Sequence, residues 1–501
     1  MKKTKRVLAF LSALIMIISV FSSCKSNPGE TDMTVEEYLN SDGKISVNKN
    51  SIFKLPCARS DSFNPYFLVT QNNEIVSQLL YDSLFEADNT FDVKDKIAAS
   101  FTMNATDITV TLKSGVLFSD GSPVTASDVV YSFNLAKKCE RYAKQLAVIS
   151  SASAQDSSTV KFKLSENDPY AKQLLTFPII KNGSGNTADK NPIGSGKFML
   201  EIKENDYSLV PNKIHGDNPA ITTIKLVNVQ SKESITNALK IGNLSFAWDD
   251  LSSGTHTGSN SKTKRVPLNN FVFIGFNKTN AVLSDKMFRA AVSAAIDREE
   301  IASTSYHSFA TAAPSIYNPL WKYSAGTDIA SKRADEVTAK KMLEKSTYKP
   351  SQSFTILVNS ENAFRRSAAE QIAKQLNAQG IKATVSAVDF AQYQDRINKG
   401  NYDMFIGEIK LTDDMNLNTF FKKEGEMSYL LDLEKLTCDD MYLKYIAGEI
   451  PHGEFIISLK DEMPIIPVVY RKGAASYTNM MKVQPECTYG DLFENVSDWT
   501  L

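Results

Sequence analysis

The 501-residue chain is poor in the residues on which metal and nucleophilic catalysis depend. It has four histidines and five cysteines, and no CxxC, HxH or HExxH arrangement brings two zinc ligands together. A GxSxG nucleophile elbow is also absent. These absences favour a protein without a catalytic residue, a metal site or a cofactor. The alternative is an extracellular hydrolase whose nucleophile and base meet only in the folded chain.

The chain also lacks an excess of positive charge, since its formal net charge is −1. Cleavage after residue 23 would remove Lys2, Lys3, Lys5 and Arg6 and no acidic residue. The 56 basic residues then fall to 52 against 57 acidic ones, a net charge of −5. Nucleic-acid binding depends on Lys and Arg side chains that neutralise phosphates, so this class of partner is excluded.

Long apolar runs are missing except at the N-terminus. A basic cluster (2–6) precedes an apolar run (7–21), and the small residues Ser22 and Ser23 stand directly before Cys24. This order is typical of a secretion signal, and the run is short for a membrane-spanning helix. The junction resembles the lipobox of bacterial lipoproteins, although Phe21 stands where leucine is usual. The resemblance implies that Cys24 carries a lipid that holds the chain on the outer face of the cytoplasmic membrane.

The segment that follows Cys24 is polar and has little apolar content, which is typical of a solvated tether. The sequence therefore predicts a signal peptide at 1–23 and a flexible tether at 24–50. Four further cysteines, Cys57, Cys139, Cys438 and Cys487, allow three disulfide pairings in an exported protein. We favour four buried free thiols over any of these pairings.

Periodicity indicates an α/β fold. The segment 106–113 alternates apolar and polar residues like a half-buried strand, and Thr125 with Asp128 forms a capping box ahead of a helix. In the second half, an apolar strand (354–358) is followed by apolar residues at every fourth position from 364 to 376. Gly380 then ends the helix before a strand that begins at Ile381. A chain of this length is expected to fold into two or three packed units.

The order of several motifs resembles that of the family 5 extracellular solute-binding proteins, the dipeptide, oligopeptide and nickel binders of ABC importers. The strongest match is LKSGVLFSDGSPVTASDVVYSFNLA (112–136). The others are SFNPYF (62–67), IVSQLLYDSLFEAD (75–88), NPIGSGKFML (191–200), FIGFN (273–277), FRAAVSAAIDREEI (288–301), the segment 371–404 and MPIIPVVYR (463–471). The resemblance therefore covers about residues 50 to 501.

This resemblance implies a two-lobed fold of the type II periplasmic-binding-protein kind, with an extra subdomain inserted in lobe one. The expected boundaries are lobe one at 51–270 with the subdomain at about 65–185, lobe two at 271–465, and a return to lobe one at 466–501. Such proteins close on their ligand like a clamshell. The chain is then a monomer that hands a small extracellular ligand to a pair of membrane permeases with cytoplasmic ATPases.

We expect the ligand to be an oligopeptide, and nickel or a chelated metal is the second candidate. A receptor that signals instead of importing its ligand is a further possibility for the function of the chain. Many relatives carry a Gly-Trp-x-x-Asp-Tyr-x-Asp-Pro segment that this chain replaces by GEIKLTDDMN (407–416). In a continuing strand, Glu408 and Lys410 would share one side, where they could meet the two termini of a peptide. The predicted ligand-binding residues are Asn64, Tyr66, Trp248, Asp249, Tyr393, Glu408, Ile409, Lys410, Thr412 and Asp413.

Overall fold

The structure, a computed structural model, describes residues 52–185, 191–229, 231–256, 261–428 and 436–501. The predicted signal peptide, the lipidation site Cys24 and the tether lie outside the described residues. Residues Ile52–Leu501 form one compact unit. In the part of the chain that is described, no helix combines the length and the apolar character needed to cross a bilayer.

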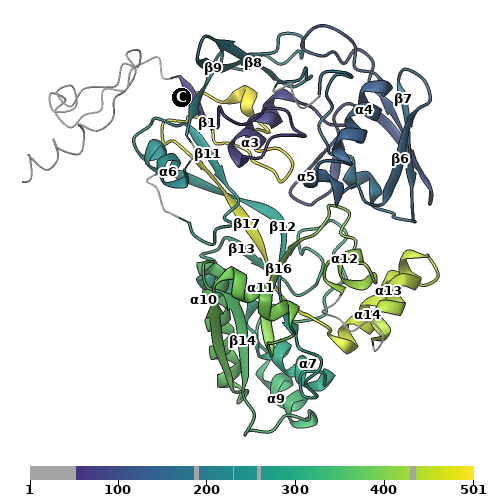
Figure 1. Cartoon of the computed structure of the whole chain (residues 1–501), viewed down its shortest axis with the longest axis vertical. Coiled ribbons are helices and arrows are strands. Elements are labelled where there is room, and N and C mark those ends of the chain that lie inside the picture. Colours follow the sequence, from purple (N-terminus) through teal and green to yellow (C-terminus); the bar gives the residue numbers. More distant parts are fainter. Residues whose placement is uncertain (1–51, 186–190, 230, 257–260, 429–435) are drawn as a thin grey trace, which may run out of the picture. The chain divides into compact units, whose positions relative to one another are not determined.

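The largest sheet has seven strands and runs through the middle of this unit (Figure 1). Its order is β11-β17-β12-β16-β14-β15, and β13 pairs with β17 as well. Strand β14 runs parallel to both of its neighbours, whereas the other pairs are antiparallel. The strands are β11 (Phe246–Asp249), β12 (Lys262–Phe276), β13 (Ala310–Ala312), β14 (Phe354–Asn359), β15 (Ala383–Val388), β16 (Met404–Lys410) and β17 (Ile466–Tyr477).

The predicted strand-helix-strand unit forms the parallel part of this sheet. Helix α10 (Ala363–Ala378) lies between β14 and β15 and buries Phe364, Ala368, Ile372 and Leu376, the residues that the periodicity placed on one face. Gly380 adopts a φ of 81° and ends the helix. The next strand begins two residues later than expected, because the N–H of Ile381 donates to the Leu376 carbonyl and belongs to the helix end.

The first half of the chain builds three smaller sheets. A four-stranded sheet has the order β1-β10-β9-β8, an antiparallel four-stranded sheet has the order β4-β5-β7-β6, and β2 and β3 form an antiparallel pair. The capping box is confirmed, since Asp128 accepts from the N–H of Thr125 at 2.8 Å at the start of α4. The strands are β1 (Phe53–Cys57), β2 (Phe85–Ala87), β3 (Val93–Asp95), β4 (Ala98–Met103), β5 (Asp107–Leu112), β6 (Ile149–Ala154), β7 (Thr159–Leu164), β8 (Phe198–Lys203), β9 (Asp206–Pro211) and β10 (Ile224–Asn228).

Helices cover the sheets and connect them (Figure 1). The longer ones are α3 (Gln71–Leu80), α4 (Ala126–Ala136), α6 (Lys232–Lys240), α7 (Lys286–Ala295), α9 (Glu336–Lys345), α10, α11 (Phe390–Asn398), α13 (Thr437–Ile446) and α14 (His452–Glu462). Shorter turns of helix are α5 (Glu140–Ala143), η1 (Ala171–Leu174), α8 (Arg298–Glu300), η2 (Ile301–Ser305), α12 (Asn418–Phe421) and η4 (Val496–Asp498).

The glycine-rich segment 191–198 is the turn that leads into β8. Its glycines lie against the backbone at the end of α3. A Cβ on Gly194 would come within 2.2 Å of the Leu80 carbonyl oxygen, and one on Gly196 within 2.5 Å of the Leu80 carbonyl carbon. Only glycine fits such a close approach.

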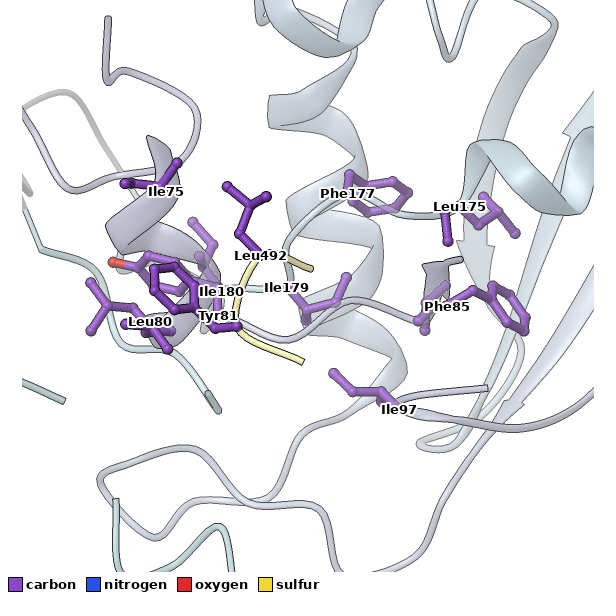
Figure 2. Close-up of a cluster of buried hydrophobic side chains, with 14 of the residues drawn as sticks. Ile75, Leu80, Tyr81, Phe85, Ile97, Leu175, Phe177, Ile179, Ile180 and Leu492 are labelled. Carbon is purple, nitrogen blue, oxygen red and sulfur yellow. The ribbon is translucent and has the colours of Figure 1, made fainter. Parts of the chain in front are cut away.

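The chain end packs against elements from the beginning of the chain. Figure 2 shows Leu492 among Ile75, Leu80 and Tyr81. The N–H of Leu492 donates to the side chain of Gln78 at 3.0 Å. The boundaries predicted between the lobes and the inserted subdomain stay predictions.

The buried apolar residues form three large clusters, and β17 contributes to all of them. Ala475 and Tyr477 belong to the first cluster, which fills the part of the unit built from the first half of the chain and the chain end. Val468 and Val469 belong to the second cluster, beneath α7 and α10. Tyr470 belongs to the third, which includes residues of α12, α13 and α14.

Candidate functional site

A cavity of about 510 Å³ opens beside Trp248 and is called the Trp248 cavity here. It is lined by the loop after β1, the start of α3, one side of α6, the strand β11 and the end of β17. Two predicted ligand-binding residues, Trp248 and Asp249, are in its wall. Its volume falls in the range of small-ligand pockets, which is about 300–1,000 Å³.

Trp248 both lines this cavity and packs against the first apolar cluster. It is half-buried in β11, opposite Ala475 of β17. The indole occupies the space over Gly473, where a Cβ would come within 2.1 Å of the ring. A glycine inside a strand often marks such a close approach, so Gly473 was a signal in the sequence for where the ring lies.

The charged wall of the cavity is formed by an ion pair that the sequence did not predict. Lys232 of α6 contacts the Asp249 carboxylate at 2.7 Å and also donates to the Ser253 hydroxyl at 2.7 Å. His256 lines the same cavity, and burial lowers its pKa below the usual value. No sequence pattern marks Lys232 or His256, because they are brought together only by the fold.

Glu408 lies on β16, as expected, but its carboxylate has partners within the chain. Arg471 of β17 donates to it at 2.6 Å through Nε, and the side-chain amide of Asn270 donates at 3.0 Å. Arg365 lies 3.8 Å from its second oxygen. Glu408 is 12% exposed and Arg471 is 3% exposed, so this is a largely buried ion pair. Glu408 is therefore already neutralised without a ligand.

Lys410 and Asp413 lie near Tyr489 in the chain end. The Lys410 ammonium is 5.9 Å from the centre of the Tyr489 ring, and the Tyr489 hydroxyl donates to Asp413 at 2.6 Å. Gln145 donates to the other oxygen of Asp413 at 2.7 Å. Burial raises the pKa of Asp413, and these hydrogen bonds together with the charge of Lys410 oppose that rise. Asp413 thus joins three segments that are far apart in the sequence.

The other predicted site residues have internal contacts. Asn64 is buried and accepts from the N–H of Tyr66 within its own loop, and the Tyr66 hydroxyl donates to the Pro178 carbonyl. Tyr393 donates to the Ile406 carbonyl at 2.8 Å. Ile409 is buried in the third cluster, and the Thr412 hydroxyl donates to Asp414 at 2.5 Å. Of these five residues, none lines the Trp248 cavity, and only Thr412 lines another cavity, which lies near α12.

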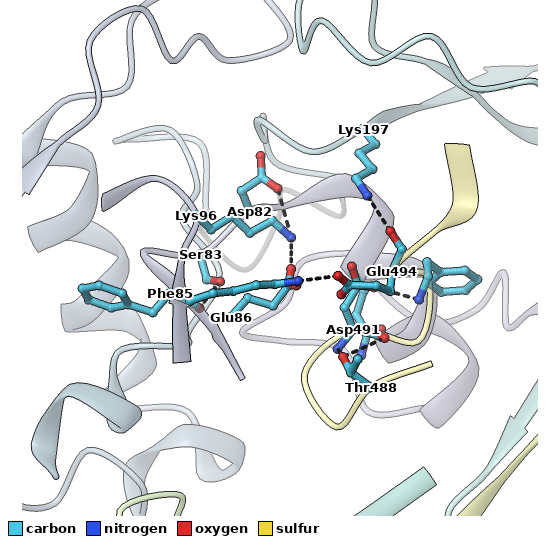
Figure 3. Close-up of polar contacts among 12 residues, drawn as sticks. Asp82, Ser83, Phe85, Glu86, Lys96, Lys197, Thr488, Asp491 and Glu494 are labelled. Atoms are coloured by element: carbon cyan, nitrogen blue, oxygen red, sulfur yellow. Dashed lines mark hydrogen bonds and ion pairs between the residues drawn. The ribbon is translucent and has the colours of Figure 1, made fainter. Parts of the chain in front are cut away.

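One group of carboxylates has the spacing of a metal site. Oxygens of Glu86, Asp491 and Glu494 lie within 4.8 Å of one another. Figure 3 shows that lysines reach the same group: Lys96 contacts Glu86 at 2.5 Å. Lys94 contacts Glu86 at 3.0 Å and also pairs with Glu494. Burial would lower the pKa of Lys96, but the surrounding carboxylates raise it. The ammonium groups of these lysines already neutralise the carboxylates, so this cluster does not fit a metal ion.

The four cysteines in the described part of the chain are free, as the sequence analysis favoured. Cys57, Cys438 and Cys487 are buried, and Cys139 is half-buried. Burial raises the pKa of Cys57 to about 11 and that of Cys487 to about 12. Thiols with such pKa values are almost fully protonated at neutral pH and are poor nucleophiles.

Comparison with known proteins gives relatives over most of the chain. The oligopeptide-binding protein AppA of Bacillus subtilis (strain 168) is 26% identical over 445 residues, which cover 80% of each chain. The crystal structure of the ABC transporter substrate-binding protein CtaP from Listeria monocytogenes matches with a TM-score of 0.69 and 20% identity, over 90% of this chain and 98% of that one.

A third similar structure is NikA from Brucella suis in complex with Fe(III)-EDTA. It matches with a TM-score of 0.67 and 16% identity, over 90% of this chain and all of the other. These likenesses confirm the predicted type II periplasmic-binding-protein fold with its mixed α/β character.

The model of the bacterial extracellular solute-binding proteins, family 5, matches residues 92–427, which is more than half of the chain. This match confirms the expectation of a binding protein that acts outside the cytoplasm rather than an enzyme. The chain belongs to the family 5 bacterial extracellular solute-binding proteins.

Proposed function

We propose that this protein is the lipid-anchored binding component of an ABC importer, which captures an oligopeptide in the Trp248 cavity and delivers it to the membrane permeases. The observation that carries the proposal is the position of the cavity beside β11, which forms one edge of the seven-stranded sheet. The similarity to the oligopeptide-binding protein AppA of Bacillus subtilis supports the choice of an oligopeptide as the ligand.

An edge strand can pair with an extended peptide through its main chain, and such pairing accepts many side chains. Ala247, Trp248 and Asp249 of β11 all line the cavity. Trp248 offers a large flat surface to a ligand side chain, and the Lys232–Asp249 pair supplies both signs of charge. This combination suits a zwitterionic chain better than a purely apolar solute.

Binding of nickel or of a chelated metal is the second candidate, because His256 is in the cavity wall and NikA from Brucella suis shares the fold. Mass spectrometry of the ligand that leaves the purified protein on denaturation separates the two. Peptides support the main proposal, and a metal complex without peptide supports the second one.

Replacing Trp248 by alanine is expected to weaken binding of the recovered peptide by about 2 kcal/mol or more, or roughly 30-fold, because a central aromatic contact is lost. Isothermal titration calorimetry measures the affinity. Phe390→Ala is the matched control, since Phe390 is an exposed aromatic residue outside the cavity. If the Trp248→Ala protein has an unchanged affinity for the peptide but a much lower melting temperature, Trp248 stabilises the core and does not contact the ligand.

Replacing Cys24 by alanine is expected to release the protein from the membrane fraction, since the proposed acyl chains supply about 0.8 kcal/mol per buried methylene and cannot be attached without the thiol. Fractionation of cells that express either form, followed by immunoblotting, measures the release. Cys57→Ala is the control, because this buried thiol lies outside the anchor. A cleaved Cys24→Ala protein that stays with the membrane would contradict lipid anchoring.

A further inference from the structure

A second cavity of about 260 Å³, the Asp168 cavity, lies between the segment 166–170 and the residues around α13 and α14. It shares no lining residue with the Trp248 cavity. Asn167, Pro169 and Gly448 are exposed members of its wall, so the cavity has a mouth toward solvent.

Aromatic rings form part of the wall of the Asp168 cavity. Tyr317 and Trp321 stack with ring centres 5.3 Å apart, and Tyr170 meets Trp321 edge-on at 4.8 Å. His452 adds a further ring, lies 3.1 Å from the Tyr317 hydroxyl, and has its pKa lowered by burial. A neutral His452 adds no positive charge, so the rings form an uncharged surface of the kind that attracts cations.

Two buried carboxyl groups, those of Asp168 and Asp414, face the same cavity. Asp414 accepts from the Asn416 side chain at 2.6 Å and from the Thr412 hydroxyl. One oxygen of Asp168 accepts from the N–H of Tyr170 at 2.8 Å. Its other oxygen, Oδ2, is buried and receives no hydrogen bond from an N–H or a hydroxyl of the described residues, and the Asp168 side chain is within hydrogen-bonding reach of the Asp414 carboxyl.

No lysine or arginine neutralises this pair within the described ranges of the chain. Lys422, from the end of α12, binds Glu166 instead. Burial, together with the neighbouring carboxyl of Asp414 and the more distant Glu166, raises the pKa of Asp168 well above its usual range. Two buried acids without a cation must share a proton or take up a positive charge from outside.

A buried donor faces the same cavity. Trp321 is 2% exposed and lines the cavity, and its Nε1–H has no acceptor among the described residues. A buried indole N–H usually finds a partner. The cavity therefore presents an acid pair without a cation, formed by Asp168 and Asp414, and one unmet donor on Trp321.

We propose that the Asp168 cavity is a second ligand site, which binds the protonated amine of a small molecule that also carries an oxygen acceptor. The ammonium N–H donates to Asp168 Oδ2, the aromatic faces stabilise the positive charge, and the ligand oxygen accepts from Trp321. A quaternary ammonium has no N–H to donate. A metal ion would prefer more oxygen ligands than these two carboxyls and the rings provide.

Ethanolamine is the probe, because it carries one ammonium and one hydroxyl. Calorimetry at pH 7 in buffers of different ionisation enthalpy is expected to show binding with release of about one proton, since the cation replaces the shared proton of Asp168 and Asp414. Choline, which lacks an N–H, and 1-propanol, which lacks the charge, are expected to bind at least about tenfold more weakly.

Asp168→Asn is expected to weaken ethanolamine binding by about tenfold or more and to abolish the proton release. Asp440→Asn, an exposed change on the outer side of α13, is the matched control. Trp321→Phe keeps a ring but removes the donor, so it should weaken ethanolamine binding and leave propylamine binding unchanged. This second variant keeps the test decisive if Asp168→Asn fails to fold.

The site does not depend on the proposed peptide function. Trp248→Ala should keep full affinity for ethanolamine, whatever it does to peptide binding. Equal affinity for choline and ethanolamine, undiminished binding by Asp168→Asn, or no measurable binding of any amine at millimolar concentration would overturn the proposal.

Discussion

Replacing Arg471 by methionine is expected to lower the free energy of unfolding by about 3–5 kcal/mol, because it leaves the largely buried carboxylate of Glu408 without its main cation. Arg471 donates to Glu408 and, through Nη1, to the Asp250 carbonyl at 2.6 Å. Arg365, at 3.8 Å, is too distant to take over the short contact. Urea unfolding followed by circular dichroism measures the change.

Two further variants separate this effect from a general loss of an arginine. Arg333→Met removes an exposed partner of Glu299 and should cost less than about 1 kcal/mol. The double variant Arg471→Met/Glu408→Gln removes both charges and should recover part of the lost stability. A single Arg471→Met variant that is as stable as Arg333→Met would show that the buried pair contributes little.

The same pair changes what a charge reversal at Glu408 would report. The sequence places Glu408 and Lys410 where they could meet the termini of a peptide, and the variants Glu408→Lys and Lys410→Glu would test such contacts. With Arg471 and Arg365 beside it, a lysine at 408 would disturb folding before it disturbs a ligand. Lys410 is exposed, so reversal there remains a test of binding.

The second large effect concerns pH. Asp168→Asn is expected to become more stable than the parent protein as the pH rises above about 4, by up to about 1.4 kcal/mol for each pH unit. The folded protein holds the Asp168 pKa high, chiefly through burial and then through Asp414. Above the unfolded pKa of about 4, the unfolded chain releases this proton and the folded chain keeps it, so rising pH favours unfolding.

The comparison must be made between the two proteins, because other groups titrate in the same range. Asp413, whose pKa is also raised by burial, is common to both and cancels in the difference. Thermal unfolding of both proteins from pH 4 to pH 8 without added amine measures the difference between their stabilities at each pH. If the curves run parallel over this range, Asp168 is ionised in the folded protein and carries no shared proton.

The elements that the sequence predicted well depend on local patterns. The apolar face of α10, its end at Gly380 and the capping box of α4 involve residues a few positions apart, so periodicity and propensity are enough to find them. The start of β15 was placed two residues early, because the helix end continues through a hydrogen bond that no pattern marks.

Of the predicted site residues, two line the cavity in which we propose that the ligand binds, and both lie on the strand β11. Trp248 and Asp249 lie in the cavity wall, but Asn64 stabilises its own loop, which explains an Asn-Pro motif without any ligand. Arg471 and Glu408 are 63 positions apart, and Asp168 meets Asp414 from another part of the chain. Such pairs depend on the packing of distant segments, which a single sequence does not show.

Because β17 contributes residues to all three large apolar clusters, it influences how the protein unfolds. A strand whose residues belong to all three large clusters cannot be released from one of them without loosening its neighbours in the others. Units that open independently give separate transitions and graded protection of amide hydrogens, whereas linked units open together. The backbone amides of β17 should therefore be among the slowest to exchange, and residues 52–501 should melt as one cooperative block.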